Sequence, residues 1–260
     1  MSTSSLKSSL DSFSLDNPIN SRSGKRSRLV HIEREDPQFA EVQQLFNKGW
    51  RHRKKDRPYV QTVFKVLWPN TVLEPYLQYR SEVESTVRAR DRSGNEKLLF
   101  HGTNRACLLG EKPNNVLLCG LRECYLCSIL RTSFDITKCG AKNTFKRFGH
   151  GIYTTVCSSK ADDYSHSGAE NVNFRVMLVS RVVLGKAYRR YRNAPDLIKP
   201  PSGYHSVAGE TGWDLNYEET VCYDNDAIRP AYLVVYGEEP LVAMNFKAFI
   251  STMFKTPLAS

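Results

Sequence analysis

The chain has 260 residues, of which 40% are hydrophobic and 25% are charged, with a formal net charge of +10 and a pI near 9.3. This composition is typical of a soluble globular protein, and no apolar run approaches the roughly 18 residues of a membrane-spanning helix, so we expect no membrane partner. The N-terminus lacks an apolar signal-peptide core, and seven cysteines are an odd count, typical of reduced thiols. We therefore expect an intracellular protein, nuclear or cytoplasmic. The positive charge suits an anionic partner, either a phosphate-bearing cofactor or nucleic acid, and composition does not choose between them.

The first 35 residues are rich in serine and contain little to bury, so we predict a disordered tail over 1–35. Its basic run at 24–28 resembles a weak nuclear-import patch, but a solvated basic run is the better reading. Asp36 followed by Pro37 predicts the start of a helix, which Gly49 would end. Apolar residues recur between them at helical spacing: Phe39, Val42, Leu45 and Phe46. The folded domain is therefore expected to start at residue 36.

Residues 51–57 carry five basic side chains against one acidic side chain. Such a loop could contact phosphates, although it is more often merely solvated. The alternating pattern at 60–66 then predicts a half-buried strand. A helix follows, with Pro75 in its first turn. One face of this helix carries Leu73, Tyr76, Arg80, Val83 and Val87. A turn at 92–95 leads into a strand at 97–101.

The second half of the chain is expected to consist of short strands separated by turns. A short helix near 114–118 precedes a cysteine-rich segment, and the long apolar run at 175–185 predicts a core strand. A turn is expected at 200–203. Further strands are expected at 204–207, 216–223 and 231–236, and the last of these would close the sheet. Because no internal repeat or linker is visible, residues 36–240 are expected to form one α+β domain, followed by a C-terminal tail at 241–260.

Cysteines cluster in the middle of the sequence, at Cys119, Cys124, Cys127 and Cys139. A Cys-x-x-Cys pair is favourable for a four-thiolate zinc site. The spacing to the outer two residues is irregular, however, which favours buried free thiols, and we assign no metal site from the sequence.

Four polar side chains stand at the ends of strand or turn segments: His101, Tyr153, Tyr164 and Glu219. Taken singly, each would more often be a satisfied polar residue or part of the core. Together, an imidazole, two phenol rings and a carboxylate indicate a functional site, since core strands rarely have polar ends without a reason. The glycines at 149 and 151 do not continue as Gly-x-Gly-x-x-Gly, which disfavours a Rossmann dehydrogenase.

Six segments resemble, in order and spacing, the catalytic domain of the poly(ADP-ribose) polymerase family of diphtheria-toxin-like ADP-ribosyltransferases. They are His101-Gly102-Thr103, Gly120-Leu121-Arg122, Gly149-His150-Gly151-Ile152-Tyr153, Ser159-Lys160-Ala161-Asp162-Asp163-Tyr164, Gly203-Tyr204-His205-Ser206-Val207 and Tyr217-Glu218-Glu219-Thr220-Val221-Cys222-Tyr223-Asp224. The resemblance implies the ADP-ribosyltransferase fold, with a mixed or antiparallel split β-sheet and a few flanking helices. It also implies that NAD+ is bound as a substrate and consumed.

The resemblance implies roles for five residues. His101, Tyr153 and Glu219 would be the catalytic triad, and the NAD-binding residues would be His101, Gly102, Arg122, Tyr153 and Tyr164. The two tyrosines would sandwich the nicotinamide ring, and Gly102 would offer backbone groups to its carboxamide. His101 would bind ribose hydroxyls on the adenosine side. Glu219 would accept the 2′-hydroxyl of the other ribose and stabilise the oxocarbenium-like transition state.

The implied function is transfer of ADP-ribose from NAD+ to a protein, or to the chain itself, with nucleic acid as an alternative acceptor. Transfer of single units is preferred over chain elongation, because the sequence has no room for the family's regulatory domain or DNA-binding modules. One position departs from the family pattern, since Ala161 stands where a serine usually binds the carboxamide. That loss would cost about 1 kcal/mol, or roughly fivefold in affinity. A catalytically silent NAD- or ADP-ribose-binding module is therefore the main alternative, and a basic nucleic-acid binder is a third.

Overall fold

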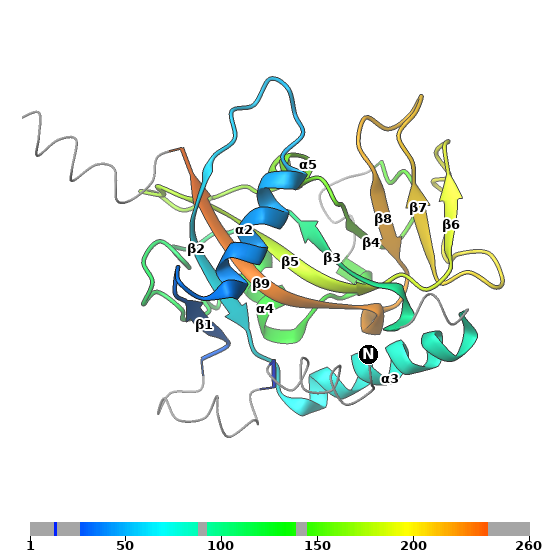
Figure 1. Ribbon diagram of the computed structural model, residues 1–260, viewed down its shortest axis with the longest axis horizontal. Helices are drawn as coiled ribbons and strands as arrows, with labels where there is room; N and C mark the ends of the chain where they lie inside the picture. The colour runs from blue at the N-terminus through cyan, green and yellow to red at the C-terminus, as the bar shows by residue number, and fades with distance from the viewer. Residues whose placement is uncertain (1–12, 15–26, 88–92, 139–144, 239–260) are drawn as a thin grey trace, which may run out of the picture.

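The computed structural model describes residues 13–14, 27–87, 93–138 and 145–238, and the statements below concern these residues. They form two sheets, a five-stranded sheet in the order β1-β2-β9-β5-β3 and a four-stranded sheet in the order β4-β8-β7-β6 (Figure 1). The strands are β1 Leu29–Ile32, β2 Tyr59–Val66, β3 Glu96–His101, β4 Ile152–Thr154, β5 Arg175–Val183, β6 Ala187–Arg190, β7 Ser206–Gly209, β8 Glu219–Cys222 and β9 Ile228–Gly237. The α-helices are α2 Pro37–Gly49, α3 Asn70–Thr86, α4 Tyr125–Thr132 and α5 Ser158–Asp162, and short 3-10 turns lie at Ser93–Asn95, Ile136–Lys138 and Asn225–Ala227.

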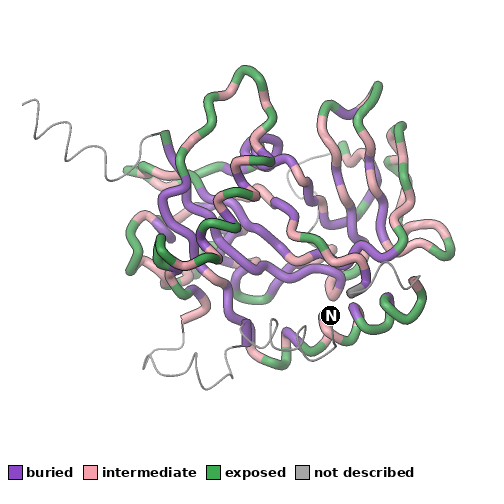
Figure 2. The backbone as a smooth tube through the Cα atoms, in the orientation of Figure 1, coloured by how far each residue is buried: buried purple, intermediate pink, exposed green. Residues whose placement is uncertain are grey.

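The five-stranded sheet is antiparallel throughout and holds most of the core. Its strands β5 and β9 are buried on both faces, which explains their unbroken apolar sequences (Figure 2). One face packs against α2 through Phe39, Val42 and Phe46. The other face packs in a second cluster with apolar residues of α3 and α4. The expected α+β class with a split sheet is confirmed.

The two sheets meet at the end of β3. Phe100 donates its backbone N–H to the carbonyl of Thr155 at 2.8 Å, and Thr155 donates back to Phe100 at 3.0 Å. Thr155 directly follows β4, which pairs antiparallel with β8. This junction brings His101, Tyr153 and Glu219 onto neighbouring strands, although they are far apart in the sequence.

Several expected elements are confirmed. Helix α2 begins as predicted, because the side chain of Asp36 accepts a hydrogen bond from the N–H of Gln38 at 2.8 Å. The core strand at 175–185 is β5, and the turn at 200–203 closes with a hydrogen bond from the N–H of Tyr204 to the carbonyl of Pro201. No helix among the described residues is long and apolar enough to cross a membrane.

The predicted tail over 1–35 is wrong for residues 29–32, which form β1 and pair with β2. Phe13 is also buried, against Tyr232. The rest of the proposed tails lies mostly outside the described residues, and the domain division stays a prediction. Strand β2 is not half-buried as expected: it lies between β1 and β9 with both faces covered, so even Gln61 and Thr62 are buried.

Other corrections concern local turns and strand ends. Helix α3 begins at Asn70, so Pro75 lies inside it and not in its first turn. Residues 114–118 form no helix. Strand β3 is an edge strand of its sheet, while β9, expected to close the sheet, is its central strand. Strand β7 begins at Ser206 and not at 204, and β8 covers only Glu219–Cys222 of the expected 216–223.

Candidate functional site

His101 ends β3 and is held by β4. Its Nδ1 lies 2.8 Å from the carbonyl oxygen of Tyr153, and the ring of Phe134 packs edge-on at 4.9 Å between centroids. A carbonyl only accepts, so Nδ1 carries the proton and Nε2 of the neutral ring is an acceptor. Burial lowers the pKa of His101, opposed by the hydrogen bond to Tyr153. The neutral imidazole can thus accept a hydrogen bond from a ligand hydroxyl.

The lowered pKa of His101 predicts a pH dependence of stability. Below the ordinary pKa of about 6.5, His101 binds a proton more readily in the unfolded chain than in the folded chain. The free energy of unfolding therefore falls as pH decreases. The limiting slope for one proton is about 1.4 kcal/mol per pH unit. In His101→Gln, whose amide can still donate to Tyr153, the free energy of unfolding should fall less between pH 7.5 and 5.5 than in the wild type. Urea unfolding at both pH values measures this, and equal losses in the two proteins would contradict the shift.

Glu219 opens β8 and forms a buried ion pair. Its Oε1 lies 2.7 Å from Nζ of Lys160, and the side chains of the pair are only 9% and 11% exposed. Lys160 also donates to the carbonyl of Tyr217 at 2.9 Å. Burial lowers the pKa of Lys160, and the Glu219 carboxylate opposes this shift. The ion pair therefore places a positive charge directly against this buried carboxylate.

The second carboxylate oxygen of Glu219 has no such partner. Oε2 is buried, and no other described residue donates a hydrogen bond to it. A buried carboxylate oxygen without a donor is costly, because folding removes the water that would otherwise bind it. The position suits a ligand that supplies a hydroxyl or an N–H.

Tyr153 lies on the same face of its sheet as Glu219. It stands opposite Val221 in the antiparallel pair of β4 and β8, and Val221 is two residues from Glu219. Its hydroxyl donates to the carbonyl of Gly149 at 2.8 Å and accepts from the N–H of Phe148 at 2.9 Å. These bonds attach Tyr153 to the backbone of Phe148 and Gly149 and fix the orientation of its ring.

Tyr164 follows α5 and is exposed. Partial burial and then the negative charge of Glu219 raise the pKa of Tyr164, so its hydroxyl lies within the electrostatic influence of that carboxylate. The structure therefore groups Tyr164 with Glu219. The sandwiching of a nicotinamide ring between Tyr153 and Tyr164 stays a prediction.

Helix α5 joins both sides of the site. A Cβ on Gly102 would lie 1.8 Å from the carbonyl oxygen of Ala161 and 2.9 Å from Oγ of Ser165. Glycine is thus required at 102 for packing against α5, a reason that the sequence did not show. The methyl group of Ala161 is itself buried, in the same apolar cluster as Phe100.

The structure differs from the sequence prediction at two residues: Lys160 belongs to the site without having been predicted, and Arg122 was predicted but has no described link to it. Lys160 falls within a matched segment but was given no role, although a lysine flanked by small residues before Tyr164 is a signal that could have been followed. Arg122 is exposed on the loop before α4, and no hydrogen bond or ion pair described by the structure joins it to His101, Tyr153 or Glu219. Its part in NAD+ binding stays a prediction.

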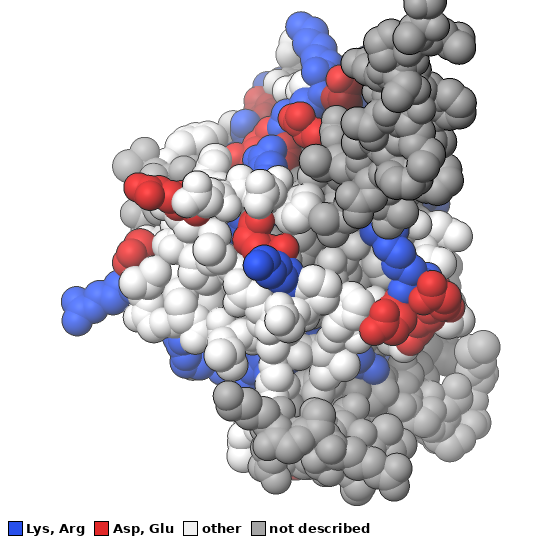
Figure 3. All heavy atoms as spheres, turned by 90° about the vertical axis from the view of Figure 1, so that its left-hand side faces the viewer, with Lys and Arg blue, Asp and Glu red and all other residues white. Residues whose placement is uncertain are grey.

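The basic segment 51–57 is tied to the site by ion pairs. Arg51 lies 3.1 Å from Glu218, and Lys55 lies 2.9 Å from Asp162 and also pairs with Asp163. These pairs neutralise two of the cations that could have contacted phosphates. Among the described residues on the face drawn in Figure 3, basic and acidic side chains lie next to one another. The structure thus adds no support to the reading as a nucleic-acid binder.

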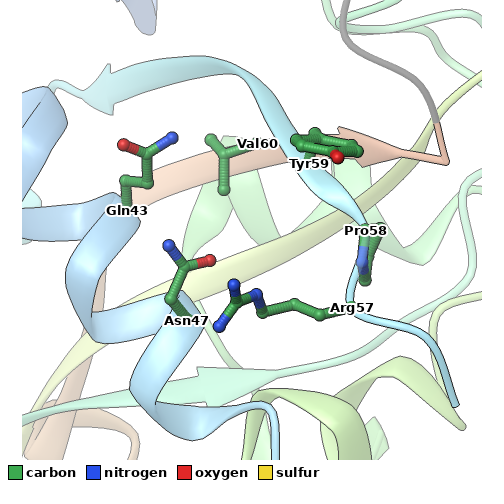
Figure 4. A pocket seen from close by; sticks show the side chains of 6 residues that line it. All are labelled: Gln43, Asn47, Arg57, Pro58, Tyr59 and Val60. Carbon is green, nitrogen blue, oxygen red and sulfur yellow. The ribbon is translucent and has the colours of Figure 1, made fainter.

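A separate hollow of about 260 Å³ lies between α2 and the start of β2. Its lining residues are Gln43, Asn47, Arg57, Pro58, Tyr59 and Val60 (Figure 4). The Arg57 side chain extends toward Asn47 across this hollow. None of the predicted site residues lines it, so we do not assign it to the site.

Part of the chain is similar to a known family of catalytic domains. Residues 109–213 match the poly(ADP-ribose) polymerase catalytic domain, a range that includes Tyr153, Lys160 and Tyr164 but neither His101 nor Glu219. The mouse protein mono-ADP-ribosyltransferase PARP4 (Mus musculus) is 23% identical over 81% of this chain and 9% of its own length. The chicken protein mono-ADP-ribosyltransferase PARP3 (Gallus gallus) is 27% identical over 70% of this chain and 30% of its own length.

A plant relative extends the comparison. Poly [ADP-ribose] polymerase 1 of Arabidopsis thaliana is 29% identical over 51% of this chain and 12% of its own length. The chain thus spans less than a third of the length of each of these three relatives. The matched domain, the relatives and the split-sheet fold agree with one another. Over residues 109–213 the chain is thus similar to the poly(ADP-ribose) polymerase catalytic domain.

Proposed function

We propose that this chain is an NAD+ ADP-ribosyltransferase, which cleaves the nicotinamide–ribose bond and transfers ADP-ribose to a protein acceptor or to itself. The observation that carries the proposal is Oε2 of Glu219, a buried carboxylate oxygen to which no described residue donates, in a side chain that pairs with Lys160. A sugar hydroxyl would satisfy it. The match of residues 109–213 to the catalytic domain and the names of the relatives support the same activity.

The proposed reaction needs little proton transfer at the leaving group. The C–N bond breaks, its electron pair leaves with neutral nicotinamide, and positive charge develops on the ribose. Oε2 of Glu219 would accept the 2′-hydroxyl of that ribose and stabilise the charge, with the most benefit in the transition state. The acceptor then bonds to C1′ and releases its proton.

The other residues would hold the dinucleotide in place. Nε2 of His101 accepts in the neutral ring and would bind a hydroxyl of the adenosine ribose. The rings of Tyr153 and Tyr164 would hold the nicotinamide ring, whose positive charge favours aromatic faces. Lys160 would hold the carboxylate of Glu219 in position through their ion pair and would not contact the substrate.

We propose transfer of single ADP-ribose units. The printed names of the mouse and chicken relatives specify mono-ADP-ribosyl transfer, whereas that of the plant relative specifies the polymer. The number of units is measured by incubating the purified chain with biotinylated NAD+ and resolving the products by electrophoresis and intact mass. We expect discrete bands and one added ADP-ribose per modified site, whereas a high-molecular-weight smear would indicate a polymerase.

A catalytically silent NAD-binding module is the second candidate, and Ala161 favours it. Its buried methyl group cannot supply the hydroxyl that the family usually provides for the carboxamide. Release of nicotinamide from NAD+ separates the two functions. A transferase releases nicotinamide with or without an acceptor, while a module binds NAD+ and releases none.

A further inference from the structure

Four cysteines from three separate segments converge beside α4. Cys107 follows β3, Cys119 lies in the next loop, and Cys124 and Cys127 stand at the N-terminus of α4. Their sulfur atoms all lie within 4.8 Å of one another. The sequence grouping contains three of these residues with Cys139, which lies outside the described residues, and favours free thiols. The structure supplies Cys107 as the fourth member.

The distances between the sulfur atoms fit a tetrahedral metal site. The sulfur of Cys107 lies 3.7 Å from that of Cys124 and 3.6 Å from that of Cys127. Zn–S bonds of about 2.3 Å place two sulfurs of a tetrahedron about 3.8 Å apart. A disulfide needs about 2.0 Å, and all four cysteines are free. Four sulfur ligands in a tetrahedron are typical of zinc among the metals of proteins.

The backbone around the cluster supports thiolates. Backbone N–H groups of Leu109, Cys127 and Cys119 donate to the sulfurs of Cys107, Cys124 and Cys127 respectively. In a metal complex these N–H groups would stabilise the negative charge on the sulfur ligands. Two of the four cysteines are buried, and the other two are half-buried. The cluster is thus enclosed but can be reached by an ion.

We propose that Cys107, Cys119, Cys124 and Cys127 form a structural zinc site. Binding of Zn²⁺ would release the thiol protons still present and give a four-thiolate complex with no open position for a substrate, so the ion would take no part in chemistry. Its effect would be to fix the loop of residues 107–124 onto α4.

The site lies next to the part of the chain that carries His101. The side-chain N–H of Asn104 donates to the carbonyl of Glu123 at 2.8 Å. The backbone carbonyl of Asn104 accepts a hydrogen bond from the N–H of Leu126 at 3.0 Å. Phe134, which packs against the ring of His101, follows α4 directly. A zinc ion that holds α4 would therefore also support the His101 side of the candidate site, an extension that rests on the proposed function.

The metal content of the full-length chain tests the site. The chain is produced in zinc-supplemented medium, purified without chelators and measured by elemental mass spectrometry. We expect about one zinc per chain in the wild type and in Cys157→Ser, a buried cysteine outside the cluster, and little zinc in Cys124→Ser. Cys119 lies in a loop and is only half-buried, so Cys119→Ser should disturb the fold less than Cys124→Ser does. It should lose zinc to the same extent as Cys124→Ser. Absence of zinc from the wild type, retention of zinc in both cluster variants, or one iron per chain instead would overturn the assignment.

Two further measurements do not depend on transferase activity. Cobalt reconstitution should give the intense d–d absorption of a tetrahedral thiolate complex in the wild type and in Cys157→Ser but not in Cys119→Ser. Removal of zinc should speed tryptic cleavage after Arg122, which is exposed between Cys119 and Cys124, and leave cleavage after the exposed Arg53 unchanged. Zinc binding without any nicotinamide release would contradict the proposed function alone, and an unchanged rate of cleavage after Arg122 would contradict the structural role of the ion.

Discussion

Glu219→Gln is expected to lower the rate of nicotinamide release from NAD+ by about 10²- to 10³-fold. The amide keeps the shape of the side chain and an acceptor for Lys160, but it removes the negative charge that would face the developing oxocarbenium ion. Because that charge is needed most in the transition state, kcat should fall while KM for NAD+ changes little. Initial rates over a range of NAD+ concentrations measure both constants.

The neighbouring carboxylate provides a matched control for Glu219→Gln. Glu218 pairs with Arg51 at the surface, where an ion pair contributes only about 0–1 kcal/mol. Glu218→Gln should therefore keep both its activity and its stability. Thermal unfolding of Glu219→Gln shows whether the fold is retained. A folded Glu219→Gln with wild-type turnover would remove this carboxylate from the mechanism.

Gly102→Ala is expected to lower both stability and activity. The added Cβ would lie 1.8 Å from the carbonyl oxygen of Ala161, a backbone atom that cannot rotate away, so β3 and α5 must move apart. Overpacking of this kind typically costs about 1–3 kcal/mol. Because α5 carries Lys160, the shift would also displace Glu219, and a displacement of about 1 Å can cost about 10²-fold in rate.

Gly168→Ala is the control for this substitution. Gly168 is exposed, and a Cβ there would meet no atom within 4 Å. Its stability should stay within about 0.5 kcal/mol of the wild type. Chemical denaturation and nicotinamide release, measured on both variants, separate close packing from a general effect of alanine. Wild-type values for both quantities in Gly102→Ala would show that β3 and α5 are not packed as described.

The sequence was sufficient for elements with local signals. The cap and proline at Asp36 and Pro37 predicted the start of α2, and the apolar run at 175–185 predicted β5. The candidate site residues His101, Tyr153 and Glu219 could be named from the resemblance, and the structure places them on neighbouring strands. Their catalytic roles await the experiments above.

Features that depend on distant segments could not be predicted in the same way. The pairing of Lys160 on α5 with Glu219 on β8 joins two distant segments, and no local pattern encodes it. Cys107 was missed as a partner of the Cys-x-x-Cys pair because only the return of the chain after β3 brings it there. The burial of β2 on both faces likewise depends on helices and strands elsewhere, so its alternating sequence was misleading.

Helix α5 contacts the site at several points within five residues. Ser159 accepts hydrogen bonds from the N–H groups of Arg51 and His52, Lys160 pairs with Glu219, and Ala161 packs on Gly102. Substitutions at these positions would therefore all disturb the same short helix, so their effects on stability and activity are coupled. The losses of stability and activity should not be additive. A substitution on α5 should cost less in a variant that already carries another α5 substitution than it costs in the wild type.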